Sequence, residues 1–83
     1  MTHPLSLFIV DDHALFREGL VRLLGNDPLL HIVGSAATVE QALERLPRTG
    51  VDVLIVDYDL GDDTAVTLVR RLREEEYGGR ILL

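Results

Sequence analysis

The sequence contains no cysteine, no tryptophan and no lysine, so all 8 of its basic residues are arginines. Without cysteine, the chain has no disulfides, no thiolate metal sites and no cysteine nucleophile. None of its apolar runs approaches the roughly 20 residues of a membrane-spanning helix, and its start (MTHP) lacks the basic segment of a secretion signal. These absences favour a soluble, cytoplasmic protein with no membrane partner.

Positive charge is scarce as well. The 14 acidic residues outnumber the 8 basic ones, which gives a net charge of −6 with neutral histidines. A segment this acidic is not expected to bind the phosphate backbone of a nucleic acid, or an anionic membrane, by itself. The remaining composition, 47% hydrophobic and 27% charged over 83 residues, is typical of one globular domain.

Short apolar runs alternate with segments of helical spacing along the whole chain. The runs are continuous, which is typical of parallel strands covered on both faces. We predict strands over 5–10, 29–34, 51–57 and 80–83, and helices over 13–25, 38–46 and 64–77. This alternation predicts an α/β fold, in which a doubly wound parallel sheet is layered by helices.

Each predicted helix has an apolar face and a recognisable start or end. In the first helix, the residues expected to face the core are Phe16, Leu20, Leu23 and Leu24. Thr38 and Gln41 have the spacing of a capping box at the start of the second. The glycine pair 78–79 closes the third.

The chain stops on an apolar run, 80–83, that reads as the opening of a strand. An uncovered strand at a sheet edge invites pairing with another chain. We therefore expect the 83 residues to be a fragment of a longer protein. We also expect self-association as a dimer, through the edge of this strand or by exchange of elements between chains.

Acidic residues follow two of the predicted strands. Asp11 and Asp12 come directly after the first strand, and Asp57 ends the third. If these strands are neighbours, the three carboxylates meet at the carboxyl end of the sheet, where open α/β sheets bind their ligands. Three carboxylates in one pocket repel each other, and a hard cation such as Mg²⁺ relieves the repulsion while leaving positions for phosphate oxygens. The alternative is that Asp12 merely caps the first helix.

Two segments resemble a known family. Residues 9–20 (IVDDHALFREGL) closely resemble the opening of bacterial response-regulator receiver domains, in the form typical of the NarL/LuxR subfamily. Residues 53–60 (VLIVDYDL) resemble the phosphoacceptor strand and loop of the same family. The resemblance implies a flavodoxin-like fold, and residues 1–83 then form a partial receiver domain that lacks its last strand and two helices.

The resemblance also implies roles for particular residues. Asp57 is the implied phosphoacceptor, and Mg²⁺ is held by Asp12 directly, by Asp11 largely through water, by Asp57 and by the backbone carbonyl of Asp59. A histidine kinase is the implied phosphoryl donor, and a downstream helix-turn-helix domain outside this chain is the implied DNA-binding part. The chain then catalyses at most its own phosphorylation and dephosphorylation, and is not a metabolic enzyme.

Some features depart from the family pattern. Gly61 stands where the family usually has proline, which leaves the loop after Asp57 freer in its backbone. The family's switch serine or threonine, its phosphate-binding lysine and its aromatic switch residue have no counterpart in the 83 residues. We therefore expect the fragment itself to be poorly active.

Two other classes of function remain open. A Mg²⁺-dependent phosphohydrolase of the haloacid dehalogenase type would use Asp57 as nucleophile and Asp59 as general acid, although Leu60 follows where that motif has threonine or valine. A purely structural module would act through self-association alone. His13 is interpreted as an ordinary residue of the first helical turn, and His31 as having no metal-binding role.

Overall fold

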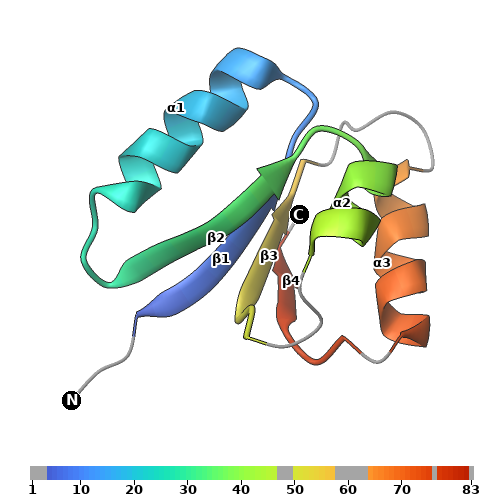
Figure 1. Cartoon of the computed structure of the whole chain (residues 1–83). Coiled ribbons are helices and arrows are strands. Elements are labelled where there is room, and N and C mark those ends of the chain that lie inside the picture. The colour runs from blue at the N-terminus through green and yellow to red at the C-terminus, as the bar shows by residue number, and fades with distance from the viewer. Residues whose placement is uncertain (1–3, 47–49, 58–63, 76, 83) are drawn as a thin grey trace.

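The computed structural model describes residues 4–46, 50–57, 64–75 and 77–82, and the structural statements below concern these residues. Strands and helices alternate along the chain (Figure 1). The strands are β1 (Leu5–Val10), β2 (Leu30–Ala36), β3 (Val53–Val56) and β4 (Arg80–Leu82). The helices are α1 (Ala14–Gly25), α2 (Val39–Arg45) and α3 (Thr64–Glu74). In the part of the chain described, no helix is long and apolar enough to cross a membrane.

The four strands form one parallel sheet in the order β2-β1-β3-β4. Helix α1 lies on one side of the sheet, and α2 and α3 lie side by side on the other (Figure 1). The expected α/β fold with a doubly wound parallel sheet is therefore confirmed. The chain reverses its winding direction between β1 and β3, so the carboxyl ends of these two strands form the switch point of the sheet.

The core lies between the sheet and the α2–α3 layer. Alternate residues of each strand point to the same face, so Phe8 and Val10 of β1 face this layer together with Leu54 and Val56 of β3. Leu68 and Leu72 of α3 pack onto them and are fully buried. This packing buries the side of β1 and β3 that faces α2 and α3.

The first helix is far more exposed than its sequence predicts. The side of α1 that packs on the sheet holds only half-buried residues, among them Leu20 and Leu24. Phe16 is 62% exposed and Leu23 is 70% exposed, so the expectation that both face the core was wrong. Within the described residues α1 packs mainly on β2, so only one side of the helix is covered.

A capping box has two reciprocal hydrogen bonds, and the start of α2 forms one of them as predicted. The Gln41 backbone N–H donates to Thr38 Oγ1 at 3.1 Å, so Thr38 is the N-cap. The Gln41 side-chain Oε1 accepts from the backbone N–H of Ala37 at 2.9 Å, one residue earlier than the standard motif predicts. The loop that joins β2 to α2 is thereby tied to the first helical turn.

Three elements differ from their predicted bounds by two residues or more at one end. Strand β2 extends to Ala36, beyond residue 34, because its pairing with β1 continues to Val10. Strand β3 is shorter than 51–57. Helix α3 ends at Glu74 rather than 77, and Tyr77 turns into the core, where its hydroxyl donates to the Val51 carbonyl at 3.3 Å.

Candidate functional site

The backbone ladder continues for one residue past the ends of β1 and β3 and fixes two acidic residues. Val10 and Val56 are register partners in these neighbouring strands. The Asp57 N–H donates to the Val10 carbonyl at 2.9 Å, and the Asp11 N–H donates to the Ala36 carbonyl at 3.0 Å. Asp11 and Asp57 therefore leave the sheet at the same edge, next to each other.

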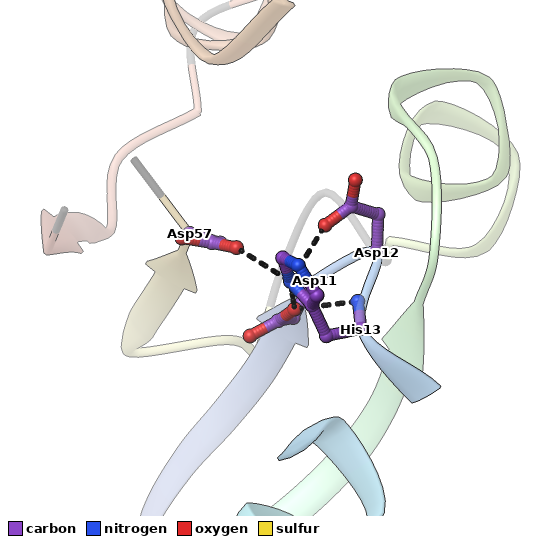
Figure 2. A group of neighbouring side chains, drawn as sticks. All are labelled: Asp11, Asp12, His13 and Asp57. Carbon is purple, nitrogen blue, oxygen red and sulfur yellow. Dashed lines mark hydrogen bonds and ion pairs between the residues drawn. The ribbon is translucent and has the colours of Figure 1, made fainter. Parts of the chain in front are cut away.

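These residues belong to a cluster of four side chains, Asp11, Asp12, His13 and Asp57 (Figure 2). Each offers one ligand atom, and these atoms all lie within 4.8 Å of one another. The three carboxylates predicted from the strand ends thus meet in space. Asp59, Tyr58 and Gly61 lie outside the described residues.

The four side chains of the cluster differ in their exposure to solvent. The Asp11 side chain is only 4% exposed, that of Asp57 22%, and those of Asp12 and His13 are 45% and 66% exposed. The deepest carboxylate thus lies at the bottom of an open site. A small ion or a phosphoryl group can approach from the side of Asp12 and His13.

His13 is not the ordinary helical residue that we expected. It is the N-cap of α1, in an extended conformation, and its side chain turns back onto the carboxylates. Its Nδ1 lies 3.3 Å from Asp11 Oδ1, 3.0 Å from Asp12 Oδ1 and 3.4 Å from Asp57 Oδ2. Because His13 occupies the N-cap position, the alternative that Asp12 caps α1 is wrong.

Two hydrogen bonds hold the loop between β1 and α1. The backbone N–H of His13 donates to Asp11 Oδ1 at 2.8 Å, and Arg17 Nη1 donates to the Asp11 carbonyl oxygen at 2.6 Å. Arg17 was missed by the sequence reasoning. Its contact with the loop could have been predicted only from its position one helical turn after the N-cap, because a long side chain at that position reaches back over the preceding loop.

The carboxylates shift the titration of the histidine. The hydrogen bond to Asp11 raises the pKa of His13 above its ordinary value of 6.5, and the negative charge of Asp12 raises it further. Desolvation lowers the pKa and is the next largest effect, while the charge of Asp11 and a hydrogen bond to Asp57 raise it by smaller amounts. The acidic neighbours therefore favour the imidazolium form of His13, whose positive charge offsets their negative charge.

The donor set fits a hard divalent cation. Mg²⁺ is usually bound by one or two carboxylates with several waters, at sites that leave room for phosphate oxygens. Asp11, Asp12 and Asp57 supply carboxylate oxygens within one small, solvent-accessible cluster. The residues present are therefore suited to hold Mg²⁺.

Comparisons with known proteins agree with this geometry. Residues 7–83 match the family model of the response regulator receiver domain. The DNA-binding transcriptional activator DevR/DosR of Mycobacterium tuberculosis is 45% identical over 67 residues, which cover 81% of this chain and 31% of that protein. The nitrate/nitrite response regulator NarL of Escherichia coli is 28% identical over 80 residues, 96% of this chain and 37% of that protein. The chain thus spans well under half the length of these relatives.

Solved structures give the same result. The signal receiver domain of NarL from Mycobacterium tuberculosis has a TM-score of 0.71 at 29% identity, over 95% of this chain and 64% of that one. RcsB of Salmonella typhimurium has a TM-score of 0.78 over 96% of this chain and 42% of that one, but at 22% identity it shows the fold alone. None of these matches supports a haloacid dehalogenase-type phosphohydrolase, whereas the resemblance to NarL-type receivers is confirmed. The chain belongs to the response regulator receiver domain family.

Proposed function

We propose that Asp57 accepts a phosphoryl group from the phosphohistidine of a histidine kinase. One observation carries this proposal: Asp57 directly follows a central strand, β3, and its carboxylate lies in one cluster with Asp11 and Asp12. The sheet fixes the Asp57 backbone, and its side chain is 22% exposed, so that a donor can reach the carboxylate.

Asp11, Asp12 and Asp57 would hold a Mg²⁺ ion in this function, together with the backbone carbonyl of Asp59. The bound ion would supply positive charge that offsets the negative charge on the phosphoryl oxygens. Asp11 is held by two hydrogen bonds, because its side chain accepts from the His13 N–H and its carbonyl accepts from Arg17. The pair of bonds orients the carboxylate before an ion arrives.

The transfer makes one bond and breaks one. A carboxylate oxygen of Asp57 attacks phosphorus, the bond between phosphorus and the histidine nitrogen of the donor breaks, and the electron pair stays on that imidazole nitrogen. The product is an acyl phosphate on Asp57. In dephosphorylation, the oxygen of a water molecule attacks phosphorus and the bond between phosphorus and the Asp57 carboxyl oxygen breaks. The electron pair stays on that oxygen, which restores the carboxylate, and inorganic phosphate leaves with the oxygen and protons of the water. The chain would therefore catalyse only its own phosphorylation and dephosphorylation.

The biological role rests on the relatives. DevR/DosR is named as a DNA-binding transcriptional activator and NarL as a response regulator, and the match covers 31% and 37% of their lengths. We propose that these residues serve a cytoplasmic transcriptional regulator whose DNA-binding part lies outside this chain. With a net charge of −6, the present residues are poorly suited to bind DNA themselves.

Self-association belongs to the same proposal. Strand β4 pairs with β3 on one side and is the last strand of the sheet among the described residues, and Leu82 is 59% exposed. Such an edge can pair with a second copy. Sedimentation velocity is expected to show dimers whose fraction grows with concentration. A strict monomer up to about millimolar concentration, the range of the weakest specific contacts, would remove this part of the proposal.

The phosphoacceptor role is tested by labelling the chain with a small phosphoryl donor, such as acetyl phosphate, in the presence of Mg²⁺. Intact mass spectrometry is expected to show slow gain of one phosphoryl group, and borohydride trapping should place it on Asp57. Asp57→Asn should abolish the gain. Asp27→Asn is the matched control, because Asp27 Oδ1 only accepts from the Leu29 N–H, a bond that asparagine keeps. Equal labelling of the Asp57→Asn variant would refute the assignment.

A further inference from the structure

We infer that a groove between α1 and β2 is a binding site for a small phosphate monoester. The groove lies on the side of the sheet that α1 covers (Figure 1). Four residues of α1 and one of β2 line it: Arg17, Glu18, Val21, Arg22 and Ser35. None of the four clustered side chains at the carboxyl end of the sheet is among them, so the inference does not rest on the proposed function.

The strand register turns the Ser35 side chain toward this groove. Ser35 is the register partner of Ile9 in β1, and partners on neighbouring strands point to the same face of a sheet. Phe8 and Val10, on either side of Ile9, belong to the core on the α2–α3 side, so Ile9 and Ser35 face α1. The Ser35 side chain makes no hydrogen bond within the part of the chain described. Its hydroxyl is therefore available to donate to a ligand.

Arg17 brings a guanidinium group that is already held at one nitrogen. Its Nη1 donates to the Asp11 carbonyl oxygen at 2.6 Å, and the residue is half-buried. A guanidinium carries five N–H donors in a rigid plane, so this bond leaves further donors for a ligand. Because the plane is held before a ligand arrives, less conformational entropy is lost on binding.

Positive charge outweighs negative charge around the groove. Arg17 and Arg22 line it together with one acidic residue, Glu18. Arg45 of α2 reaches β2 as well, where its Nη1 lies 3.3 Å from the Ser35 carbonyl oxygen. Among the described residues, neither Arg22 nor Glu18 makes an ion pair, so the charge of Arg22 is not already neutralised by a contact. Three of the 8 basic residues of this acidic chain therefore gather at one place.

These groups fit a phosphate monoester better than a carboxylate. A phosphate monoester carries close to two negative charges at neutral pH and three oxygens that accept hydrogen bonds. Guanidinium groups bind phosphate through paired hydrogen bonds, and two guanidiniums with a hydroxyl can serve all three oxygens. A carboxylate offers only two oxygens and one charge. The groove has a volume of about 300 Å³, which leaves room beside the phosphate for a small organic part against Val21.

The test follows the backbone amide signals of the 83-residue chain while phenyl phosphate is added, in low salt and without divalent cations. Saturating shifts are expected at residues 17–22 and at Ser35, with little change at Asp57, because the carboxylates repel an anion when no metal is present. Benzoate has a similar ring and a single charge, and should bind about tenfold more weakly or worse. Shifts that do not saturate below about 10 mM, or equal binding of benzoate, would overturn the inference.

Variants then assign the binding to the groove. Arg22→Gln removes one guanidinium from an exposed position and should weaken phenyl phosphate binding about tenfold, the effect of losing a hydrogen bond to a charged group. Arg70→Gln is the matched control, because Arg70 is an exposed arginine of α3 outside the groove, and it should bind as the wild type does. Ser35→Ala keeps every charge and should also weaken binding, which keeps the inference testable should Arg22→Gln unfold. Equal affinities in Arg22→Gln and Arg70→Gln, or unchanged affinity in Ser35→Ala, would refute the site.

Discussion

Replacing Asp57 by asparagine is expected to stabilise the metal-free chain against unfolding. The substitution keeps the shape of the side chain and removes one of the three carboxylate charges that the described residues bring together at the carboxyl end of the sheet. The ligand atoms of these residues lie within 4.8 Å of one another. Their mutual repulsion opposes folding, because the unfolded chain holds the same charges far apart.

The size of the effect follows from this separation. Two unit charges 4.8 Å apart repel by about 0.9 kcal/mol in bulk water and by about 3.5 kcal/mol at an effective dielectric constant of 20. Asp11 is buried, which moves its repulsion of Asp57 toward the larger value. Asp12 is 45% exposed, so its repulsion of Asp57 is closer to the smaller value. After discounting for solvent screening, we expect a gain of about 1–2 kcal/mol.

Thermal unfolding followed by circular dichroism measures this gain. The experiment is done in low salt, and at a pH above the raised pKa of His13, so that the charge of the imidazolium does not mask the repulsion. In a domain of this size, the melting temperature should rise by about 4–8 °C per kcal/mol. Mg²⁺ should stabilise the wild type more than the variant and so reduce the difference. Asp27→Asn, which removes a charge outside the cluster, should melt as the wild type does.

An Asp57→Asn variant that is equally or less stable than the wild type without metal would refute this reasoning. That result would mean that the carboxylates do not repel each other appreciably in the folded chain. The interpretation of the cluster as a site prepared for a cation would then lose its energetic basis.

Three further predictions concern residues around the site and at the opposite end of the sheet. Because the pKa of His13 is raised in the folded chain, the stability that its imidazolium contributes is fully present below the unfolded pKa of 6.5 and is lost as the pH rises through the folded pKa. Urea unfolding at a series of pH values should therefore show the wild type losing its stability advantage over His13→Ala between these two pKa values. A free-energy difference between the two chains that does not change with pH would contradict this prediction. Arg17→Ala removes the 2.6 Å bond to the Asp11 carbonyl, so we expect a loss of about 1–2 kcal/mol and weaker Mg²⁺ binding, both measured against Arg22→Ala, an exposed arginine of the same helix. Gly79→Ala would place a Cβ against the Tyr77 hydroxyl and 2.7 Å from the Val51 carbonyl, and should cost about 1–3 kcal/mol in chemical denaturation, whereas Gly78→Ala meets nothing within 4 Å and should not.

The sequence was sufficient for the fold because each signal was local. Continuous apolar runs predicted the strands, and the Thr38–Gln41 spacing predicted the start of α2, since a strand or a cap depends on a few neighbouring residues. The meeting of Asp11 and Asp57 was expected on the condition that the first and third strands are neighbours, and the pairing of β1 with β3 meets that condition.

Features that depend on distant packing were not predictable in this way. Helical periodicity gives the apolar face of α1 but not how much of it is covered, so the exposure of Phe16 and Leu23 was missed. The orientation of His13 depends on the backbone angles at the N-cap and on the Asp11 carboxylate. Tyr77 follows the end of α3 and packs into the core, and the helical spacing of apolar residues gives no information about a residue beyond the helix.

The pairing of β1 with β3 also has a consequence for folding. The two strands are far apart in the sequence, as the bond from the Ser6 N–H to Asp52 Oδ2 across 46 residues illustrates. A parallel pair of this kind closes a long loop, which makes it a slow step compared with helix formation. A chain that has formed only β1, α1 and β2 already holds Asp11 beside Asp12 and His13, yet it lacks Asp57. The complete cluster therefore comes into existence only with the long-range closure of the sheet, and slowly exchanging amide hydrogens in β1 and β3 would report on its assembly.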